Sequence, residues 1–275
     1  MKLGIRGHDF GKRGEFSLPE RLSQGGFDGV QLVPYKTYAD VDYSVNLSPQ
    51  RAAEISKSLE DKGLSILLLG AYFNPVHSNK EKVRLGIDVF DRYLQLEGEF
   101  KTSVVASETG SFNDDKWTYN PLNRTFSALE TVVETFSRLA SNAKKYGAGM
   151  AMEGAAGHVC YSPERLNEAL AAIGDDSIKV VFDLYNYLDG DNYADYKNIL
   201  QRGLKLFEGR IHCFHMKDCT FDGGKVTQCP IGEGNLDYSY LLREIKAYDK
   251  DAVLVLEGTT GDNIPKATKI ITELW

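Results

Sequence analysis

The sequence predicts an α/β protein in which residues 1–275 form one (β/α)8 barrel domain. Eight short apolar runs that suit β-strands recur along the chain, and a segment with a helical pattern follows each of them. Runs such as Ile66 to Leu69 are apolar throughout, which is typical of parallel strands covered on both faces. A length of 275 residues also suits this fold, because such barrels usually take about 250 residues. No GxGxxG fingerprint follows the first run, which argues against an open dinucleotide-binding sheet.

The predicted strands alternate with helices whose ends carry recognisable signals. Ser17-Leu18-Pro19-Glu20 matches a capping box, and Ser48-Pro49 places an N-cap before a proline in the first helical turn. Gly63 and Gly147 follow two helical segments, as C-terminal caps do. The strands are expected at Leu3 to Arg6, Asp28 to Val33, Leu64 to Tyr72, Ser103 to Glu108, Ala148 to Glu153, Ile178 to Asp183, Ile211 to Lys217 and Ala252 to Glu257. The later helices are expected at about Lys80 to Leu96, Thr125 to Lys145, from Ser162 onward, Tyr193 to Phe207, Tyr238 to Ala247 and Pro265 to Trp275.

Composition limits the classes of function. Hydrophobic residues at 42% and charged residues at 26% are ordinary for a globular protein, and no run approaches the roughly 18 apolar residues of a membrane helix. Met1 leads directly into the first strand without a signal-peptide pattern, so the predicted location is the cytoplasm. A net charge of −7 argues against a nucleic-acid partner and favours a small-molecule partner. Homo-oligomer formation stays open.

Polar side chains end several of the predicted strands. Glu108, Glu153, Asp183 and Glu257 each close an apolar run, and His215 stands near the end of another. In a (β/α)8 barrel these strand ends converge on the face that carries the active site. Carboxylates this close repel one another unless a cation or protons neutralise them, so a divalent metal ion is expected. Oxygen-rich ligation with one imidazole favours Mn, Mg or Co, with Zn as an alternative.

The two-residue period of a strand separates the faces of these segments. Glu153 falls in phase with Ala151, and Glu257 with Val255, so both glutamates are expected to point into the barrel mouth. His215 and His212 fall on opposite faces. His212 is therefore expected to face the helical layer and to bond the backbone.

Short motifs at the strand ends resemble a known family. They are Gly70-Ala71-Tyr72-Phe73-Asn74-Pro75-Val76-His77, Glu108-Thr109-Gly110-Ser111, Glu153 with His158 and Ser162-Pro163-Glu164, Phe182-Asp183-Leu184-Tyr185-Asn186, His215-Met216-Lys217-Asp218, Gly232-Glu233-Gly234 and Glu257-Gly258. Their order and placement resemble the xylose isomerase-like TIM barrels over nearly the whole chain. That superfamily holds sugar and sugar-phosphate isomerases and epimerases and also endonuclease IV.

The resemblance implies roles for particular residues. The implied metal ligands, of which the two glutamates also move protons, are Glu153, Asp183, His215 and Glu257. The side chains implied to face the substrate are His77, Glu108, His158, Asn186 and Lys217. Many family members carry histidine at the position of Asn186, and an amide is a poor zinc ligand, which disfavours the multi-zinc endonuclease chemistry.

Structural roles stay open for some of these side chains. Glu108 could equally cap a helix or lie in solvent, His77 and His158 could be loop residues, and Lys217 could form a salt bridge to Asp218 or Glu257. The loop Asp218 to Asn235 is expected to form a rim or lid, because Gly223-Gly224 and Gly232-Glu233-Gly234 punctuate it.

Together these features favour a metal-dependent isomerase or epimerase of a sugar, a sugar phosphate or a related polyol ketone, working by proton transfer between two glutamates. An inosose-type dehydratase could use the same groups. An endonuclease IV-like phosphodiester hydrolase and a non-catalytic sugar-binding barrel are less favoured. The sequence does not name the sugar, because rim loops set the specificity of such barrels.

Overall fold

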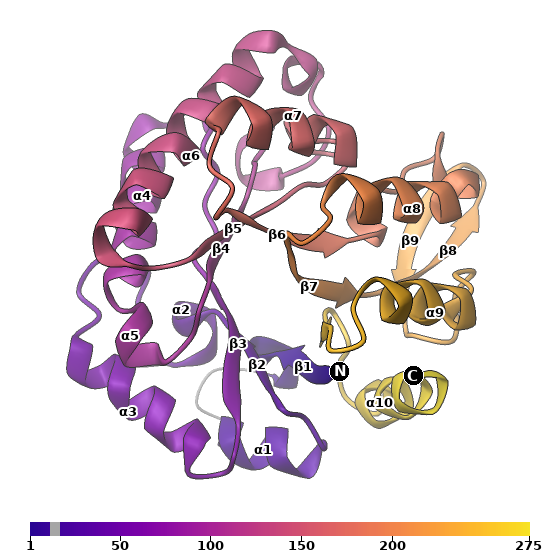
Figure 1. Cartoon of the computed structure of the whole chain (residues 1–275), viewed down its shortest axis with the longest axis horizontal. Helices are drawn as coiled ribbons and strands as arrows, with labels where there is room; N and C mark the ends of the chain where they lie inside the picture. The colour runs from indigo at the N-terminus through magenta and orange to yellow at the C-terminus, as the bar shows by residue number, and fades with distance from the viewer. Residues whose placement is uncertain (12–16) are drawn as a thin grey trace.

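The computed structural model describes residues 1–11 and 17–275, and over these residues eight parallel strands close into a barrel (Figure 1). The barrel strands are β1 (Lys2–Arg6), β2 (Gly29–Leu32), β3 (Ser65–Gly70), β4 (Val105–Glu108), β5 (Met150–Glu153), β6 (Lys179–Asp183), β7 (Ile211–Met216) and β10 (Val253–Leu256). β1 closes the ring because it pairs with β2 on one side and β10 on the other. The predicted (β/α)8 fold is therefore confirmed.

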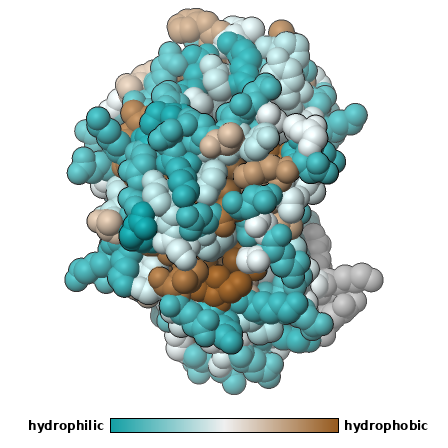
Figure 2. Space-filling view, turned by 90° about the vertical axis from the view of Figure 1, so that its right-hand side faces the viewer, coloured by the Kyte–Doolittle hydropathy of each residue, from teal (hydrophilic) through white to brown (hydrophobic). Residues whose placement is uncertain are grey.

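Helices surround the strands as an outer layer (Figure 1). The longer ones are α1 (Leu18–Gln24), α3 (Pro49–Glu60), α4 (Lys80–Gln95), α6 (Phe126–Tyr146), α7 (Pro163–Ile173), α8 (Tyr196–Leu206), α9 (Tyr238–Tyr248) and α10 (Asn263–Leu274). Shorter turns, which were not expected from the sequence, are α2 (Pro34–Thr37), α5 (Glu97–Phe100), η1 (Gly7–Phe10), η2 (Asp114–Lys116), η3 (Pro121–Arg124), η4 (Tyr185–Tyr187) and η5 (Tyr193–Asp195). Figure 2 shows a mainly hydrophilic outer face with one recessed hydrophobic patch in its lower half, as expected for helices that bury one apolar side.

The helix ends follow the predicted signals with one exception. Ser48 and Ser162 accept capping hydrogen bonds from backbone N–H groups in the first turns of α3 and α7. Gly147 ends α6 with a φ of 69°, a conformation that glycine adopts without strain. Ser17 precedes α1, but its side chain makes no capping bond within the described residues, so the predicted capping box is wrong. Pro19 explains part of this difference, because proline lacks one of the N–H groups that an N-cap can use.

A dry apolar layer fills the inside of the barrel. Side chains from several strands meet there in one buried cluster, formed by Leu68, Val104, Ala106, Ala151, Val181, Cys213 and Val255. Ala151 and Val255 are in phase with Glu153 and Glu257 on the same strands. This layer therefore forms the floor beneath the strand-end acids and keeps water from below them.

A bulge in β7 changes the direction of one histidine. The pairing of β6 with β7 shifts register between Ile211 and Cys213, so that His212 has no partner residue on β6. Its Nε2 donates a hydrogen bond of 2.8 Å to the carbonyl of Leu67 on β3, which lies across the ring from β7. His212 therefore points into the barrel, and its predicted orientation toward the helical layer is wrong. The bulge is the cause, because one extra residue reverses the alternation of a strand locally.

The loop after β7 contains a hairpin that was not expected from the sequence. β8 (Asp218–Asp222) and β9 (Lys225–Cys229) pair antiparallel, and Gly223 and Gly224 between them both have positive φ, as a tight hairpin turn requires. The carboxylate of Asp218 accepts hydrogen bonds from the backbone N–H groups of Gly232 and Gly234 at 2.9 and 3.1 Å, which fixes the base of the loop. Within the described ranges, no helix combines the length and apolar character needed to cross a bilayer.

Candidate metal centre and adjoining cavity

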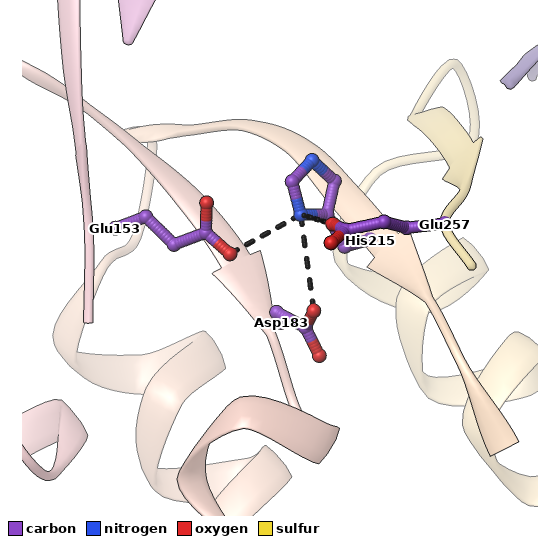
Figure 3. Close-up of side chains that lie close together, drawn as sticks. All are labelled: Glu153, Asp183, His215 and Glu257. Atoms are coloured by element: carbon purple, nitrogen blue, oxygen red, sulfur yellow. Dashed lines mark hydrogen bonds and ion pairs between the residues drawn. The ribbon is translucent and has the colours of Figure 1, made fainter. Parts of the chain in front are cut away.

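Four side chains converge at the carboxyl ends of neighbouring strands. Glu153 and Asp183 end β5 and β6, His215 lies in β7, and Glu257 directly follows β10. One potential ligand atom from each lies within 4.8 Å of the others. The Nδ1 atom of His215 is 3.2 Å from Glu153 Oε1, 3.8 Å from Asp183 Oδ2 and 2.7 Å from Glu257 Oε2 (Figure 3). The structure thus brings together the residues that the sequence predicts as metal ligands.

The donor set fits a divalent cation. Metal–oxygen and metal–nitrogen bonds of about 2.0 to 2.6 Å place ligands on opposite sides of an ion roughly 4 to 5 Å apart, which matches the observed spacing. Glu153, Asp183 and His215 are buried, with exposed side-chain fractions of 1%, 0% and 0%. With Glu257, which is 13% exposed, three carboxylates lie close together here and need nearby positive charge. A bound ion would provide it.

Lys217 lies inside this cluster rather than on the rim. Its Nζ atom is 2.9 Å from Asp183 Oδ2 and 3.0 Å from Glu257 Oε1, and it donates a hydrogen bond of 3.0 Å to Asn186 Oδ1. Burial would lower the pKa of Lys217, but Asp183 and Glu257 outweigh that effect and raise it. Lys217 is therefore a buried counter-ion, with a larger role than a surface salt bridge.

The charges inside the cluster shift the titration of its members. Burial raises the pKa of Glu153 to about 7. Burial would also raise the pKa of Glu257, but Lys217 and His215 hold it well below its usual range. Burial opposes a charge on His215, yet Glu153 and Glu257 raise its pKa well above the ordinary value. In this arrangement positive charge on His215 and Lys217 balances the carboxylates.

Asn186 bridges the two halves of the cluster. Its Nδ2 atom donates a hydrogen bond of 2.8 Å to Glu153 Oε1, and its Oδ1 atom accepts the bond from Lys217. The Asn186 amide donates through its nitrogen and accepts through its oxygen, and both atoms sit on the same carbon. A histidine ring at this position could not donate and accept at the same spacing. The amide therefore orients Glu153 and Lys217 together, and its predicted contact with substrate stays a prediction.

Sequence reasoning missed Arg6 and Asp9. Arg6 extends from the end of β1 and donates a hydrogen bond of 2.6 Å to Glu257 Oε1, while Asp9 accepts from Arg6 at 2.8 Å and from the Gly258 N–H at 2.7 Å. This pair fixes the Glu257 carboxylate and the backbone beside it. A signal was available, because Arg6 closes the first apolar run in the same way that the acids close the others.

A cavity of about 420 Å³ opens beside the cluster, and its size suits a small metabolite. Glu257, Glu108, Tyr72 and Trp117 are among the residues that line it. Burial raises the pKa of Glu108 to about 7. Glu108 lines the cavity, and its contact with substrate stays a prediction.

The two remaining predicted substrate residues lie behind the cavity wall. His158 is buried, with its Nε2 atom 3.7 Å from Glu108 Oε2 and its ring against Trp117. His77 is held between Asp115, whose carboxylate lies 3.1 Å from its Nε2 atom, and the Asn79 N–H. Each thus contacts a cavity-lining residue, Glu108 or Asp115, and direct contact with substrate stays a prediction for both.

The two histidines of β7 should respond differently to truncation. His215→Ala should abolish tight Mn²⁺ binding, because it removes the single imidazole of the donor set. His212→Ala should leave Mn²⁺ affinity nearly unchanged and cost about 1 to 3 kcal/mol of stability, because the buried carbonyl of Leu67 loses its partner. Calorimetric Mn²⁺ titration and urea unfolding of both variants measure the two effects. Equal loss of Mn²⁺ binding in both would contradict the assignment.

Comparison with known proteins agrees with the geometry. A family model described as xylose isomerase-like TIM barrel matches residues 19–274. An uncharacterized protein of Methanocaldococcus jannaschii is 22% identical over 278 residues, in a match that covers 99% of this chain and 89% of that protein. The family match thus extends over nearly all of the barrel and includes the four converging side chains.

Solved structures share the fold at low sequence identity. A D-tagatose 3-epimerase-like protein has a TM-score of 0.76 and 19% identity, covering 100% of this chain and 97% of that one. A xylose isomerase-like TIM barrel protein from Mycobacterium smegmatis, in complex with magnesium, has a TM-score of 0.74 and 14% identity, covering 100% and 95%. The probable 3-DHS dehydratase of Bacillus anthracis has a TM-score of 0.73 and 15% identity, covering 99% of each chain. The family match and the shared fold lead to one conclusion: the chain belongs to the xylose isomerase-like TIM barrel family.

Proposed function

We propose that this protein is a divalent metal-dependent isomerase or epimerase that acts on a sugar, a sugar phosphate or a related polyol ketone. The observation that carries the proposal is the placement of Glu153 and Glu257 on opposite sides of His215 (Figure 3). Their strands, β5 and β10, lie three steps apart in the barrel order, so the two carboxylates approach the mouth from different directions. Epimerisation requires this arrangement, because a proton leaves one face of a carbon and another arrives at the opposite face.

The proposed ion is Mn, Mg or Co, with Zn as the alternative, held by Glu153, Asp183, His215 and Glu257. When bound, such an ion supplies Lewis-acid polarisation of a carbonyl oxygen, which acidifies the neighbouring C–H bond. The protein's own groups position the bases. Asn186 holds Glu153 at 2.8 Å, and Arg6 holds Glu257 at 2.6 Å. Both carboxylates are thereby oriented before a substrate enters, which lowers the entropic cost of proton transfer.

A dehydratase is the second candidate, and Glu108 favours it. Dehydration of an inosose-type ketone also begins with removal of a proton next to a carbonyl, but it needs an acid to protonate the departing hydroxyl group. Glu108 lines the cavity, and with a pKa raised by burial to about 7 it can carry a proton near neutral pH. The probable 3-DHS dehydratase of the same fold supports this alternative.

A substrate panel tests both candidates. The protein is incubated with Mn²⁺ and with ketoses, their phosphates and inososes, and products are identified by NMR and mass spectrometry. Isomerisation and epimerisation conserve mass, whereas dehydration loses one water. We expect the protein to convert at least one of these ketones. The conversion should stop when a chelator is added and resume when Mn²⁺ is added back. A metal-loaded, folded protein that converts none of the panel would count against both candidates.

A further inference from the structure

Acidic and basic side chains both line the cavity beside the metal centre. Glu257, one of the proposed metal ligands, and Glu108 are among the acidic residues. The basic side chains are those of Arg6, Lys36 and Lys116. A substrate that presents its carbonyl to the ion therefore shares the cavity with these positive charges.

Two of the three carboxylates that line the cavity have cationic partners. Glu257 contacts Arg6 at 2.6 Å, and Asp115 contacts Lys82 at 2.7 Å. The third, Glu108, lies 3.7 Å from His158 Nε2, but burial lowers the pKa of His158 to about 4, so this histidine is neutral near pH 7. Burial also raises the pKa of Glu108 to about 7, which reduces its own negative charge.

The two lysines that line the cavity, Lys36 and Lys116, differ from these carboxylates because they have no ion-pair partner among the described residues. No carboxylate in the described ranges forms an ion pair with Lys36 or Lys116, although ion pairs are common among the other lysines of the chain. Both lysines are exposed, so their ammonium groups are accessible to a ligand in the cavity. Burial and the nearby Arg6 lower the pKa of Lys36, while Glu108, Glu257 and Asp9 act in the opposite direction. A negatively charged group in the cavity would offset the repulsion from Arg6.

We propose that the substrate is a polyol ketone with an anionic group, a phosphate or a carboxylate, which binds Lys36 and Lys116. This inference rests on the proposed function, since it places the ketone of the same molecule at the metal centre. It excludes free neutral sugars as the preferred substrates. Phosphate and carboxylate share the chemistry that the lysines recognise, and the experiment separates them.

Binding of unreactive polyols tests the inference without any turnover. Affinities for sorbitol, sorbitol 6-phosphate and gluconate are measured by calorimetry with Mn²⁺-loaded protein and with the Lys36→Met, Lys36→Arg and Lys116→Met variants. Lys57→Met is the matched control, because Lys57 is an exposed lysine of α3 that pairs with Asp61. All these side chains lie at the surface or in the cavity, so folding is not at risk and is checked by circular dichroism.

We expect at least one of the two anions to bind about 10-fold or more tightly than sorbitol, as charge-assisted hydrogen bonds provide. The preference should largely disappear in Lys36→Met, decrease in Lys116→Met, persist in Lys36→Arg and be unchanged in Lys57→Met. Whether the phosphate or the carboxylate benefits identifies the anionic group. Equal affinities for all three polyols, or an anion preference that survives Lys36→Met, would overturn the inference.

The same data separate failure of this inference from failure of the proposed function. Lys36-dependent anion binding in a protein that converts no ketone would leave the anion site intact and reject the isomerase. Turnover of neutral ketoses with no response to Lys36→Met would keep the isomerase and reject the anion site.

Discussion

Replacing Glu153 or Glu257 by glutamine should lower turnover by at least ~10²- to 10⁴-fold, because each carboxylate is proposed to transfer a proton and each is also a metal ligand. The amide keeps the volume of the side chain but accepts no proton at neutral pH. Steady-state kinetics on the substrate found in the panel measure the loss, and Mn²⁺ titration of each variant separates ligand loss from proton-transfer loss. Wild-type turnover by either variant would reject the two-glutamate mechanism.

Glu97→Gln provides the matched control for these variants. Glu97 is also a buried glutamate, but it lies on α5, where it accepts a hydrogen bond of 2.9 Å from the Gly149 N–H ahead of β5. The Glu97→Gln variant should be less stable than the wild type but should have the same turnover.

In D₂O the wild-type protein should place deuterium at the reacting carbon. Product that instead retains the substrate hydrogen at that carbon would indicate a hydride shift.

Lys217→Met should destabilise the metal-free protein by roughly 3 to 5 kcal/mol, the usual cost of leaving a buried charge without its partner. The Lys217 side chain is 6% exposed and contacts Asp183 and Glu257, whose charges would then face each other unneutralised. Urea unfolding at neutral pH, with chelator present, measures the change. Lys57→Met, which breaks an exposed pair, should cost no more than about 1 kcal/mol in the same assay.

Added Mn²⁺ should restore much of the stability of Lys217→Met. The ion supplies the missing positive charge, and ligands that bind only the folded state stabilise it by mass action. The gain in unfolding free energy on Mn²⁺ addition is expected to be larger in Lys217→Met than in the wild type. An unchanged unfolding free energy in the variant, or no response to Mn²⁺, would show that Lys217 is not a counter-ion of the metal site.

Much of the barrel could be predicted because its signals are local. Strands such as Met150–Glu153 and Val253–Leu256 appear in the sequence as apolar runs that end in an acid, and helices such as α3 and α7 begin at Ser-Pro caps. The hairpin β8–β9 was missed because its strands are short and, apart from the first two residues of β8, not buried, so they lack the apolar pattern that marks a buried strand. His212 was placed wrongly because a bulge interrupts the strand period without any local signal.

The sequence by itself determined the barrel and the acids at its strand ends, since strand periodicity and strand termination depend on neighbouring residues. Only the tertiary structure decided which groups surround those acids. Arg6 meets Glu257 across 251 positions of sequence, and Lys217 reaches Asp183 and Asn186 on the neighbouring strand end. Such contacts depend on closure of the ring and on strand register. The charge balance of the site and the unpaired lysines of its cavity therefore became visible only in three dimensions.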